Sequence, residues 1–387
     1  MSDIDFIKQF LNPVDKNITK KNELLSPYQL GNTMLINHDN NELNFENVKL
    51  AIIGVTEQRN AINNSGTNKA PDAVRTEIYQ LSSFNNPTVI ADLGNVKEGA
   101  TARDTYYALG KVVEYCLKKE IIPIVVGGSN DNLFGQFLGY ADMEMEVNIV
   151  HADDRLDVSF LQEELVASNY LTHIFTHKPN YLKNFSLIGY QTYLVDYNLL
   201  KILDQMKFEH VRLGALQEDV KEIEPWVRDA DILSVDISAV RCGEAPGNNN
   251  ASPNGLFGNE LCAMARYAGM SDKISSFGIY EINPEIDQRN QTSQLAAQAI
   301  WYFMDGVLAR VSDYPIISEN DFMKYAVHFH EENQNIEFLK SKKSNRWWMK
   351  VPKGDKGLYQ LIPCSYSDYE YASNLEQYPN RWIKASE

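Results

Sequence analysis

Short, continuous apolar segments rich in β-branched residues recur along the chain, and segments of helical length separate most of them. Continuous rather than alternating apolar runs are typical of strands covered on both faces, as in a parallel sheet. The pattern predicts eight strands, at residues 48–55, 87–94, 121–128, 147–152, 185–190, 210–216, 231–237 and 273–282. Strands that alternate with helices predict an α/β protein, a three-layer α/β/α sandwich with a mainly parallel eight-stranded sheet.

Two of the intervening helices can be placed from their own residues. Segment 103–119 carries apolar residues at three- and four-residue steps, which is typical of a helix with one buried face. After the eighth strand, Thr292 is a candidate N-cap for a helix whose apolar stripe runs from Leu295 to Val307.

The chain divides into a central domain and two flanking segments. Residues 1–46 carry little periodicity, and we expect them to wrap the surface of a core domain at 47–315. Residues 316–387 are predicted to form an appendage packed on the core, and an interaction module for a partner is the alternative. This last segment is rich in aromatic residues: Trp347, Trp348, Tyr359, Tyr366, Tyr369, Tyr371 and Trp382.

Charge and composition narrow the classes of partner and compartment. Lys and Arg number 36 against 52 Asp and Glu, a net charge of -16. So acidic a chain repels phosphate backbones and anionic lipids, which argues against nucleic acid or a membrane surface as partner. The N-terminus lacks a basic region followed by an apolar run, and the four cysteines form no CxxC pair. We therefore expect a cytoplasmic protein.

Polar clusters follow four of the predicted strands, at residues 128–132, 151–157, 236–250 and 281–287. In open α/β sheets the chemistry collects at the carboxyl ends of the strands, where loops present polar groups over a rigid floor. The four loops therefore predict one rim that carries the functional site.

Three segments resemble the ureohydrolase family of arginase, agmatinase and formiminoglutamase. Residues 234–256, SVDISAVRCGEAPGNNNASPNGL, resemble a Ser-x-Asp-x-Asp strand end followed by an Ala-Pro-Gly loop. Residues 278–300 are similar to the family's Glu-x-Asn-Pro-x-x-Asp motif, and residues 52–78 resemble its first strand and glycine loop. The loop at 245–256 is closer to the formiminoglutamase form. The resemblance implies the same sandwich fold and, because family members are commonly trimers or hexamers, a homo-oligomer.

The resemblance also implies a site for two manganese ions, whose six ligands lie in three short motifs. The corresponding residues here are Asn130, His151, Asp153, Arg155, Asp236 and Ser238. Only Asp236 keeps the family residue. We therefore predict that the two-manganese site is largely lost and that no cofactor is bound; the alternative is one or two manganese ions.

Arg155 adds a positive charge where the family has a carboxylate. A guanidinium cannot ligate a metal, and a like-charge contact at about 4 Å costs about 4 kcal/mol at an effective dielectric of 20. We expect Arg155 to occupy the metal's place and to pair with Asp153 or Asp236. The remaining candidate ligands for a single ion are His151, Asp153 and Asp236, with Asp131 or Asp157.

Four residues are candidates for work on a substrate. Glu281 matches the glutamate that contacts the substrate's guanidinium or amidine group in the family, although it is equally a candidate ion-pair partner for Arg155 or Arg241. Asn254 is a second candidate for substrate binding. Asp236, Glu281 and His173 are the catalytic candidates.

Two functions follow from this inventory. The first is a non-hydrolytic pseudoenzyme, a regulatory or binding protein for a small guanidino, amidino or amino-acid ligand. The alternative is a formiminoglutamase-, agmatinase- or arginase-like hydrolase of linear amidines with a rearranged metal site.

Overall fold

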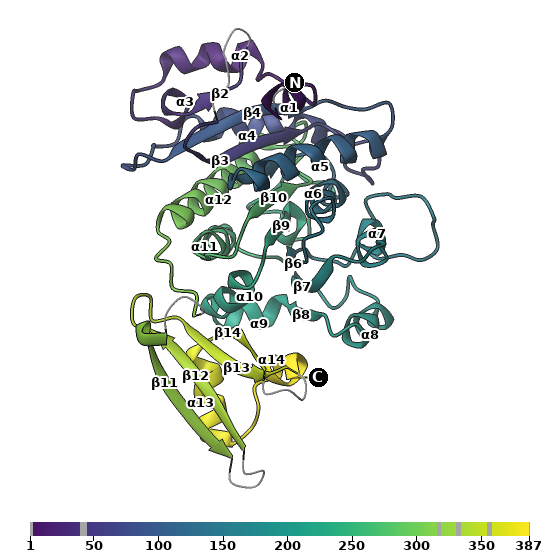
Figure 1. Ribbon diagram of the computed structural model, residues 1–387. Helices are drawn as coiled ribbons and strands as arrows, with labels where there is room; N and C mark the ends of the chain where they lie inside the picture. The colour runs from purple at the N-terminus through teal and green to yellow at the C-terminus, as the bar shows by residue number, and fades with distance from the viewer. Residues whose placement is uncertain (1–2, 39–44, 316–318, 330–333, 354–357, 387) are drawn as a thin grey trace.

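The computed structural model describes residues 3–38, 45–315, 319–329, 334–353 and 358–386. A large sheet with helices on both faces forms the body of the molecule, and a small antiparallel sheet lies at one end (Figure 1). None of the described helices is long and apolar enough to cross a membrane.

The large sheet has ten strands, and all neighbouring pairs but one are parallel. They are β1 (Leu11–Asn12), β2 (Leu35–Ile36), β3 (Val48–Val55), β4 (Val89–Val96), β5 (Ile122–Val126), β6 (Val147–Ala152), β7 (Leu182–Tyr190), β8 (Glu209–Arg212), β9 (Ile232–Asp236) and β10 (Ser276–Tyr280). The order is β1-β4-β3-β5-β10-β9-β6-β7-β8, with β2 on β4 and β1 antiparallel to β4. The eight predicted strands are confirmed as β3 to β10. The strand predicted at 210–216 ends at Arg212, where a helix begins.

Helices cover both faces of this sheet. They are α1 (Asp3–Lys8), α2 (Lys16–Thr19), α3 (Leu30–Thr33), α4 (Ala70–Ile78), α5 (Ala102–Lys118), α6 (Asn132–Ala141), α7 (Tyr170–Phe175), α8 (Tyr197–Gln205), α9 (Leu213–Glu218), α10 (Ile223–Arg228), α11 (Gly258–Gly269) and α12 (Gln291–Leu308). One apolar core joins the sheet to α4 and α9 to α12, and a second joins it to α1 and α5 to α8. The predicted three-layer α/β/α sandwich is confirmed.

The start of α12 differs from the prediction. Asn290 is the N-cap, and the Asp287 carboxylate accepts hydrogen bonds from the backbone N of Thr292 (2.8 Å) and Ser293 (2.9 Å). Thr292 therefore lies inside the first turn, where its hydroxyl accepts a hydrogen bond from Gly247 N at 2.7 Å. The predicted N-cap was wrong because a carboxylate from the preceding loop satisfies these helix amides.

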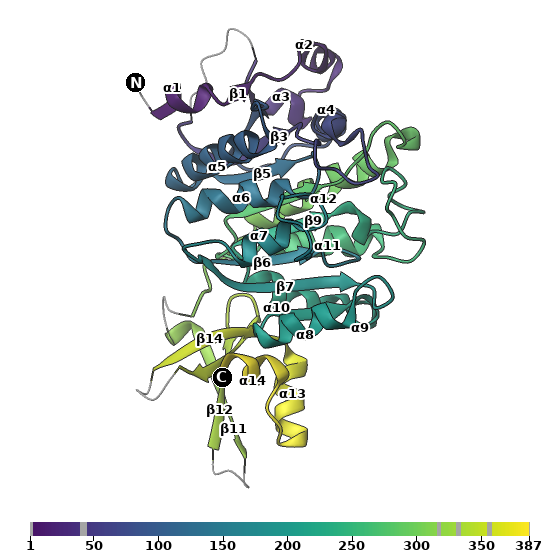
Figure 2. The same cartoon turned by 90° about the vertical axis from the view of Figure 1, so that its right-hand side faces the viewer.

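The C-terminal unit is a four-stranded antiparallel sheet covered by two helices (Figure 2). Its elements are β11 (Phe322–Phe329), β12 (Gln334–Ser341), β13 (Trp347–Pro352), β14 (Tyr359–Cys364), α13 (Tyr366–Leu375) and α14 (Asn380–Ser386). Arg228 of α10 ties the unit to the large domain, because its Nη2 donates to Trp347 O (2.9 Å) and Cys364 O (3.0 Å). Trp347 and Trp348 are buried, so these aromatic side chains pack inside the protein.

Candidate functional site

The loops that follow β5, β6, β9 and β10 meet at one edge of the sheet. After β5 the chain turns through Gly127 (φ 90°) and Gly128 (φ 71°), a left-handed conformation that favours glycine. A Cβ atom at Gly127 would lie 2.6 Å from Cδ of Pro71, so the turn has no room for a side chain. This turn brings Asn130 to the ends of the neighbouring strands.

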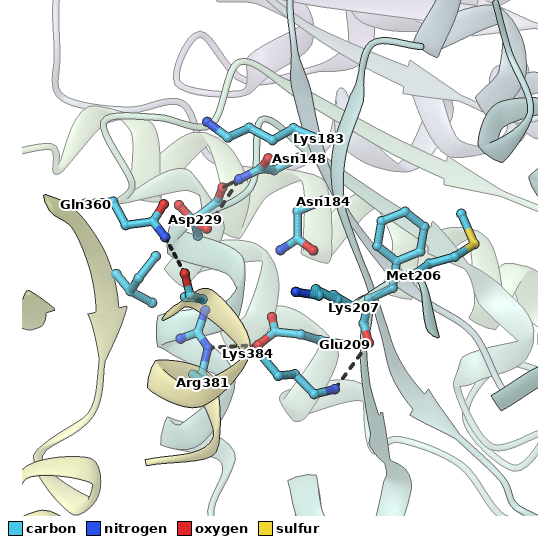
Figure 3. A pocket seen from close by; sticks show the side chains of 13 residues that line it. Asn148, Lys183, Asn184, Met206, Lys207, Glu209, Asp229, Gln360, Arg381 and Lys384 are labelled. Carbon is cyan, nitrogen blue, oxygen red and sulfur yellow. Dashed lines mark hydrogen bonds and ion pairs between the residues drawn. The ribbon is translucent and has the colours of Figure 1, made fainter. Parts of the chain in front are cut away.

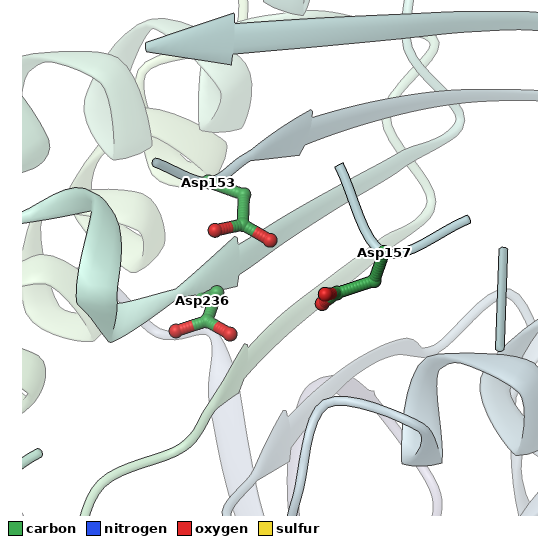
Figure 4. A group of neighbouring side chains, drawn as sticks. All are labelled: Asp153, Asp157 and Asp236. Atoms are coloured by element: carbon green, nitrogen blue, oxygen red, sulfur yellow. The ribbon is translucent and has the colours of Figure 1, made fainter. Parts of the chain in front are cut away.

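Three carboxylates form the centre of this site. Asp153 follows β6, Asp157 lies four residues further along the same loop, and Asp236 ends β9. One oxygen from each lies within 4.8 Å of the others, and the three carboxylates face a common space (Figure 4). All three residues are buried, with exposed fractions of 0%, 7% and 4% respectively. Asn130 bridges two of them, because its Nδ2 donates to Asp157 (2.6 Å) and Asp236 (3.0 Å).

Burial and mutual repulsion disfavour the charged forms of these carboxylates. Burial, followed by the neighbouring negative charges, raises the pKa of Asp153 and Asp157 well above the ordinary value. The same two causes raise the pKa of Asp236 to about 7. Without a cation, the cluster therefore retains protons at neutral pH. A divalent cation would replace those protons, so its affinity would rise with pH.

The donor set fits one oxygen-preferring divalent cation. Carboxylate and amide oxygens are the ligands that magnesium, calcium and manganese prefer. Oδ1 of Asn130 is a buried acceptor with no hydrogen-bond partner among the described residues. Three buried carboxylates would supply the negative charge that such an ion needs, and Asn130, which contacts two of them, carries an unsatisfied acceptor.

His151 supports the cluster but does not belong to it. Its Nδ1 lies 3.1 Å from Ser234 Oγ, and its Nε2 lies 2.9 Å from the Tyr170 hydroxyl and 3.3 Å from Asp153 Oδ2. Burial lowers the pKa of His151 to about 4, so the imidazole is neutral at physiological pH. The group of mutually close carboxylates therefore includes Asp157, whereas His151 contacts Asp153 from outside the group.

Arg155 lies elsewhere than predicted. Its Nε donates to Asp154 Oδ1 at 2.7 Å and its Nη2 donates to Asn250 O at 3.1 Å, while the side chain stays 35% exposed. The prediction that it fills the metal's place and pairs with Asp153 or Asp236 was wrong, because the adjacent Asp154 accepts the guanidinium. Only the backbone N of Arg155 bonds to Asp153, at 3.1 Å.

Ser238, another of the replaced ligand positions, donates hydrogen bonds to two of the carboxylates. Its hydroxyl donates to Asp153 Oδ1 at 3.2 Å, and its backbone N donates to Asp236 Oδ1 at 2.8 Å. These donors fix the orientation of two carboxylates at the cluster.

Glu281 follows β10 and lies beside the cluster. It has a left-handed backbone (φ 65°) and is 4% exposed. Asn130 N donates to its Oε1 (3.0 Å), and Asn64 Nδ2 donates to its Oε2 (2.7 Å). Burial and the nearby Asp236 raise its pKa well above the ordinary value. Neutral donors hold this carboxylate, whereas Arg241, one of its two predicted ion-pair partners, pairs with Glu244 at 3.1 Å.

A cavity of about 110 Å³ lies at the site, with Asp157, Asp236 and Glu281 on its wall. Its walls are Ile62, Asn63, Asn130, Arg155, Asp157, Ala167, Ser168, Asp236, Ser238, Asn248, Asn250 and Glu281. Apart from Asn130, the asparagines that line the cavity or hold Glu281 were not predicted: Asn63, Asn64, Asn248 and Asn250. Their signal is visible in the sequence, as the cluster at 60–64 after the first predicted strand and the run at 248–250.

Three other predicted residues lie outside this cavity. Asn254 is exposed and its Nδ2 donates to Gln191 Oε1 at 3.3 Å. His173, on α7, lines a separate cavity with Arg103, and burial lowers its pKa. Asp131 is buried and accepts a hydrogen bond from the Tyr106 hydroxyl.

Comparisons with known proteins show the family of this chain. A family model described as "Arginase family" matches residues 48–305. The formimidoylglutamase of Staphylococcus haemolyticus is 24% identical over 281 residues, which is 67% of this chain and 88% of the relative. The formimidoylglutamase of Bacillus subtilis is 22% identical over 287 residues, which is 66% of this chain and 86% of the relative.

Solved structures show the same fold at low identity. The Trypanosoma cruzi formiminoglutamase with Mn²⁺ superposes with a TM-score of 0.65 at 18% identity, over 73% of this chain and 99% of that chain. The agmatine ureohydrolase of Thermoplasma volcanium superposes with a TM-score of 0.61 at 19% identity, over 75% of this chain and 98% of that chain.

Proposed function

Because this chain belongs to the arginase family, we propose that it is a metal-dependent hydrolase of C–N bonds in linear amidines, with formiminoglutamase-like specificity. The buried cluster of Asp153, Asp157 and Asp236 is the observation that carries the proposal. The names of the relatives and the Mn²⁺ in the Trypanosoma cruzi enzyme favour this hydrolase over the pseudoenzyme predicted first.

The three aspartates would hold the cation, with Asn130 beside them. When bound, a divalent cation supplies Lewis-acid chemistry, which lowers the pKa of water at the site. Ser238 orients Asp153 and Asp236 through the bonds at 3.2 and 2.8 Å, so the carboxylates are positioned before the cation arrives. His151 and Tyr170 orient Asp153 from its other side, through a neutral contact.

Glu281 would bind the cationic amidinium of the substrate. Each of its oxygens accepts one protein hydrogen bond, which leaves lone pairs for the two N–H groups that an amidinium presents on one edge. An amidinium beside Glu281 favours the ionised carboxylate, so substrate binding offsets the cost of burying that charge. The small cavity suits a small, linear group at this position.

Hydrolysis of manganese-loaded protein tests the proposal. Formiminoglutamate, arginine and agmatine are supplied separately, and release of formamide, ammonia or urea is measured with and without chelator. We expect manganese-dependent formamide release from formiminoglutamate, and its loss in the Asp236→Ala variant. Absence of turnover on all three substrates, or turnover indifferent to Asp236→Ala, contradicts the proposal.

A non-hydrolytic binding protein is the second candidate. It rests on the replacement of five of the six family ligand positions by Asn130, His151, Asp153, Arg155 and Ser238. Elemental analysis of manganese-loaded protein also distinguishes the two candidates. Two manganese ions per chain would exclude a protein that has lost the metal site. Binding of an amidine without turnover in manganese-loaded protein would favour it.

A further inference from the structure

A second cavity lies between three helices of the large domain and shares no lining residue with the cavity at the carboxylate cluster. Helices α5, α6 and α7 lie side by side there, on one face of the large sheet (Figure 2). The volume of about 390 Å³ is within the range for small-molecule sites, about 300–1,000 Å³. The wall consists of Arg103, Tyr106, Phe134, Leu138, Leu165, His173, Thr176 and His177.

Helical spacing places these side chains on a common wall. Arg103 and Tyr106 are three residues apart on α5, and Phe134 and Leu138 are four residues apart on α6. Residues at these spacings share one face of a helix. Helix α7 contributes His173. The three helices therefore present a cation, aromatic rings and an aliphatic side chain to the same space.

Aromatic rings form most of this wall. The Phe134 ring lies at their centre, with its centroid 6.0 Å from that of Tyr106 and 6.3 Å from those of His173 and His177. Phe134 and Leu138 are only partly buried, so both leave apolar surface for a ligand to cover. An aromatic ring in the cavity would extend this cluster in the edge-on or offset geometry that aromatic pairs prefer.

Arg103 supplies a positive charge that the protein does not neutralise. It is exposed and forms no ion pair with any described residue, and the described wall contains no carboxylate. The adjacent Asp104 carboxylate instead accepts hydrogen bonds from the backbone N and the hydroxyl of Thr101, at 2.8 Å each. Behind the wall, Asp131 accepts a hydrogen bond from the Tyr106 hydroxyl, and burial raises its pKa. The guanidinium of Arg103 is therefore available to an anion.

The cavity where the large domain meets the C-terminal unit, shown in Figure 3, provides a contrast. Its ion pairs are Arg381–Glu209 (3.5 Å), Lys384–Asp204 (3.6 Å) and Lys183–Glu146 (3.6 Å). Each of these carboxylates offsets one cation. An anion would therefore gain less there than beside Arg103.

The two histidines add hydrogen-bonding groups beside this charge. His177 Nδ1 lies 2.9 Å from Pro179 O, and because a carbonyl only accepts, that nitrogen carries a proton. Burial, followed by the charge of Arg103, lowers the pKa of His173. Its ring nitrogens have no hydrogen-bond partner among the described residues. A neutral His173 thus offers one N–H to an anion that pairs with Arg103.

We propose that this cavity binds a small aromatic monocarboxylate. The planar guanidinium of Arg103 matches a carboxylate in a bidentate pair, and one carboxylate balances one cation. The aromatic body of the ligand packs against Phe134 and Leu138. The site does not depend on the amidine hydrolysis proposed above.

Calorimetry on the full-length protein tests this proposal at pH 8 and matched ionic strength, with four probes. Benzoate carries both the ring and the charge, benzamide lacks the charge, acetate lacks the ring, and cyclohexanecarboxylate replaces the aromatic ring by an aliphatic one. We expect saturable binding of benzoate and several-fold weaker binding of cyclohexanecarboxylate. Benzamide and acetate should each bind at least about tenfold more weakly than benzoate.

Variants of exposed arginines locate the binding. Arg103→Gln should lose at least about tenfold in benzoate affinity, and Arg103→Lys, which keeps the charge without the planar fork, should lose less. Arg212→Gln, at an exposed arginine that does not line the cavity, should keep the wild-type affinity. The unliganded Tm of each variant checks its fold.

Four results would overturn the proposal. They are the absence of saturable benzoate binding, benzamide or acetate binding as tightly as benzoate, cyclohexanecarboxylate binding as tightly as benzoate, and an affinity in Arg103→Gln equal to that in Arg212→Gln.

Discussion

Two regions of this molecule bury several charges, and they compensate them in different ways. Beneath the C-terminal unit, Arg228 is 3% exposed, pairs with Glu224 at 3.2 Å and stacks 4.3 Å from the Trp348 ring. Arg346 pairs with Asp313 at 3.0 Å in the same junction. The protein therefore supplies counter-ions and aromatic faces for its buried cations.

No cation forms an ion pair with the carboxylate cluster among the described residues, although the charge of nearby Arg155 opposes the rise in pKa of Asp153 and Asp157. Asp153, Asp157 and Asp236 accept hydrogen bonds from neutral groups, and Arg155, the one cation on the described cavity wall, pairs with Asp154 instead. On the proposed function, the counter-charge that the cluster lacks would come from the bound cation. At the junction, ion pairs and an aromatic ring offset part of the cost, although burial and the neighbouring Arg346 still lower the pKa of Arg228. We expect that region to contribute stability instead of chemistry.

The largest effect should come from breaking the junction. Arg228→Ala removes the bonds to Trp347 O and Cys364 O and leaves Glu224 partly buried, so unfolding free energy should fall by about 3–5 kcal/mol. Chemical denaturation followed by tryptophan fluorescence measures this. The control Arg266→Ala breaks a more exposed pair with Asp305 and should cost less than about 1 kcal/mol. Equal losses in both variants would contradict a special role for the junction.

At the carboxylate cluster, by contrast, removing a charge is expected to raise the free energy of unfolding. In metal-free protein near pH 8, Asp236→Asn removes one of three repelling charges and should raise the unfolding free energy by on the order of 2 kcal/mol. The same variant should lose at least about 100-fold of manganese-dependent amidine hydrolysis. Thermal and chemical unfolding in chelator measure the first effect, and formamide release measures the second. A destabilised Asp236→Asn protein would show that the cluster is compensated after all.

The difference in unfolding free energy between wild type and Asp236→Asn should depend on pH, because the pKa of Asp236 is raised in the folded protein. The pKa of Asp236 is 3.8 for the ordinary side chain and about 7 in the folded protein, so folded protein binds the proton more tightly. Stability of metal-free wild type therefore falls as pH rises from about 4 to about 7, and is restored below that window. Asp236→Asn lacks this contribution. Unfolding curves of the two proteins should converge near pH 4 and diverge by pH 8.

A smaller effect, on substrate binding, is expected from Asn64, which donates a hydrogen bond to Glu281. Asn64→Ala removes the 2.7 Å bond to Oε2, which should raise KM for the amidine substrate by about tenfold with a smaller change in kcat. Steady-state kinetics at saturating manganese separate the two constants. A loss confined to kcat would mean that Glu281 acts on the reacting atoms and not in substrate binding.

The smallest effect should come from Arg155. Because its guanidinium bonds to Asp154 and Asn250, Arg155→Gln should change manganese affinity by less than about threefold. Metal titration by calorimetry provides the measurement. Tenfold tighter manganese binding in the variant would restore the sequence prediction that this arginine opposes the metal.

The sequence predicted the sheet well because buried parallel strands leave continuous apolar runs, which β3 and β5 show most clearly. The edge strand β8, with the sequence EHVR, is the exception. The sequence also predicted the rim, since the strand ends carry polar clusters. The direction of a side chain such as Arg155 depends on which of the nearby carboxylates accepts its hydrogen bonds. No sequence motif indicates that the adjacent Asp154 is that carboxylate. Asn64 and Glu281 lie 217 residues apart, so only the folded chain reveals their contact.

The short strands β1 and β2 have a consequence for self-association. Together they occupy the outer side of β4, and α14 contacts β8 at the opposite edge through the Arg381–Glu209 pair. Strand addition to the large sheet is thus blocked at one edge by two-residue strands and hindered at the other. Among the described strands, β11 is the longest at a sheet edge, and its one lysine, Lys324, is exposed. Growth of the large sheet by addition of strands from further copies of the chain is therefore disfavoured.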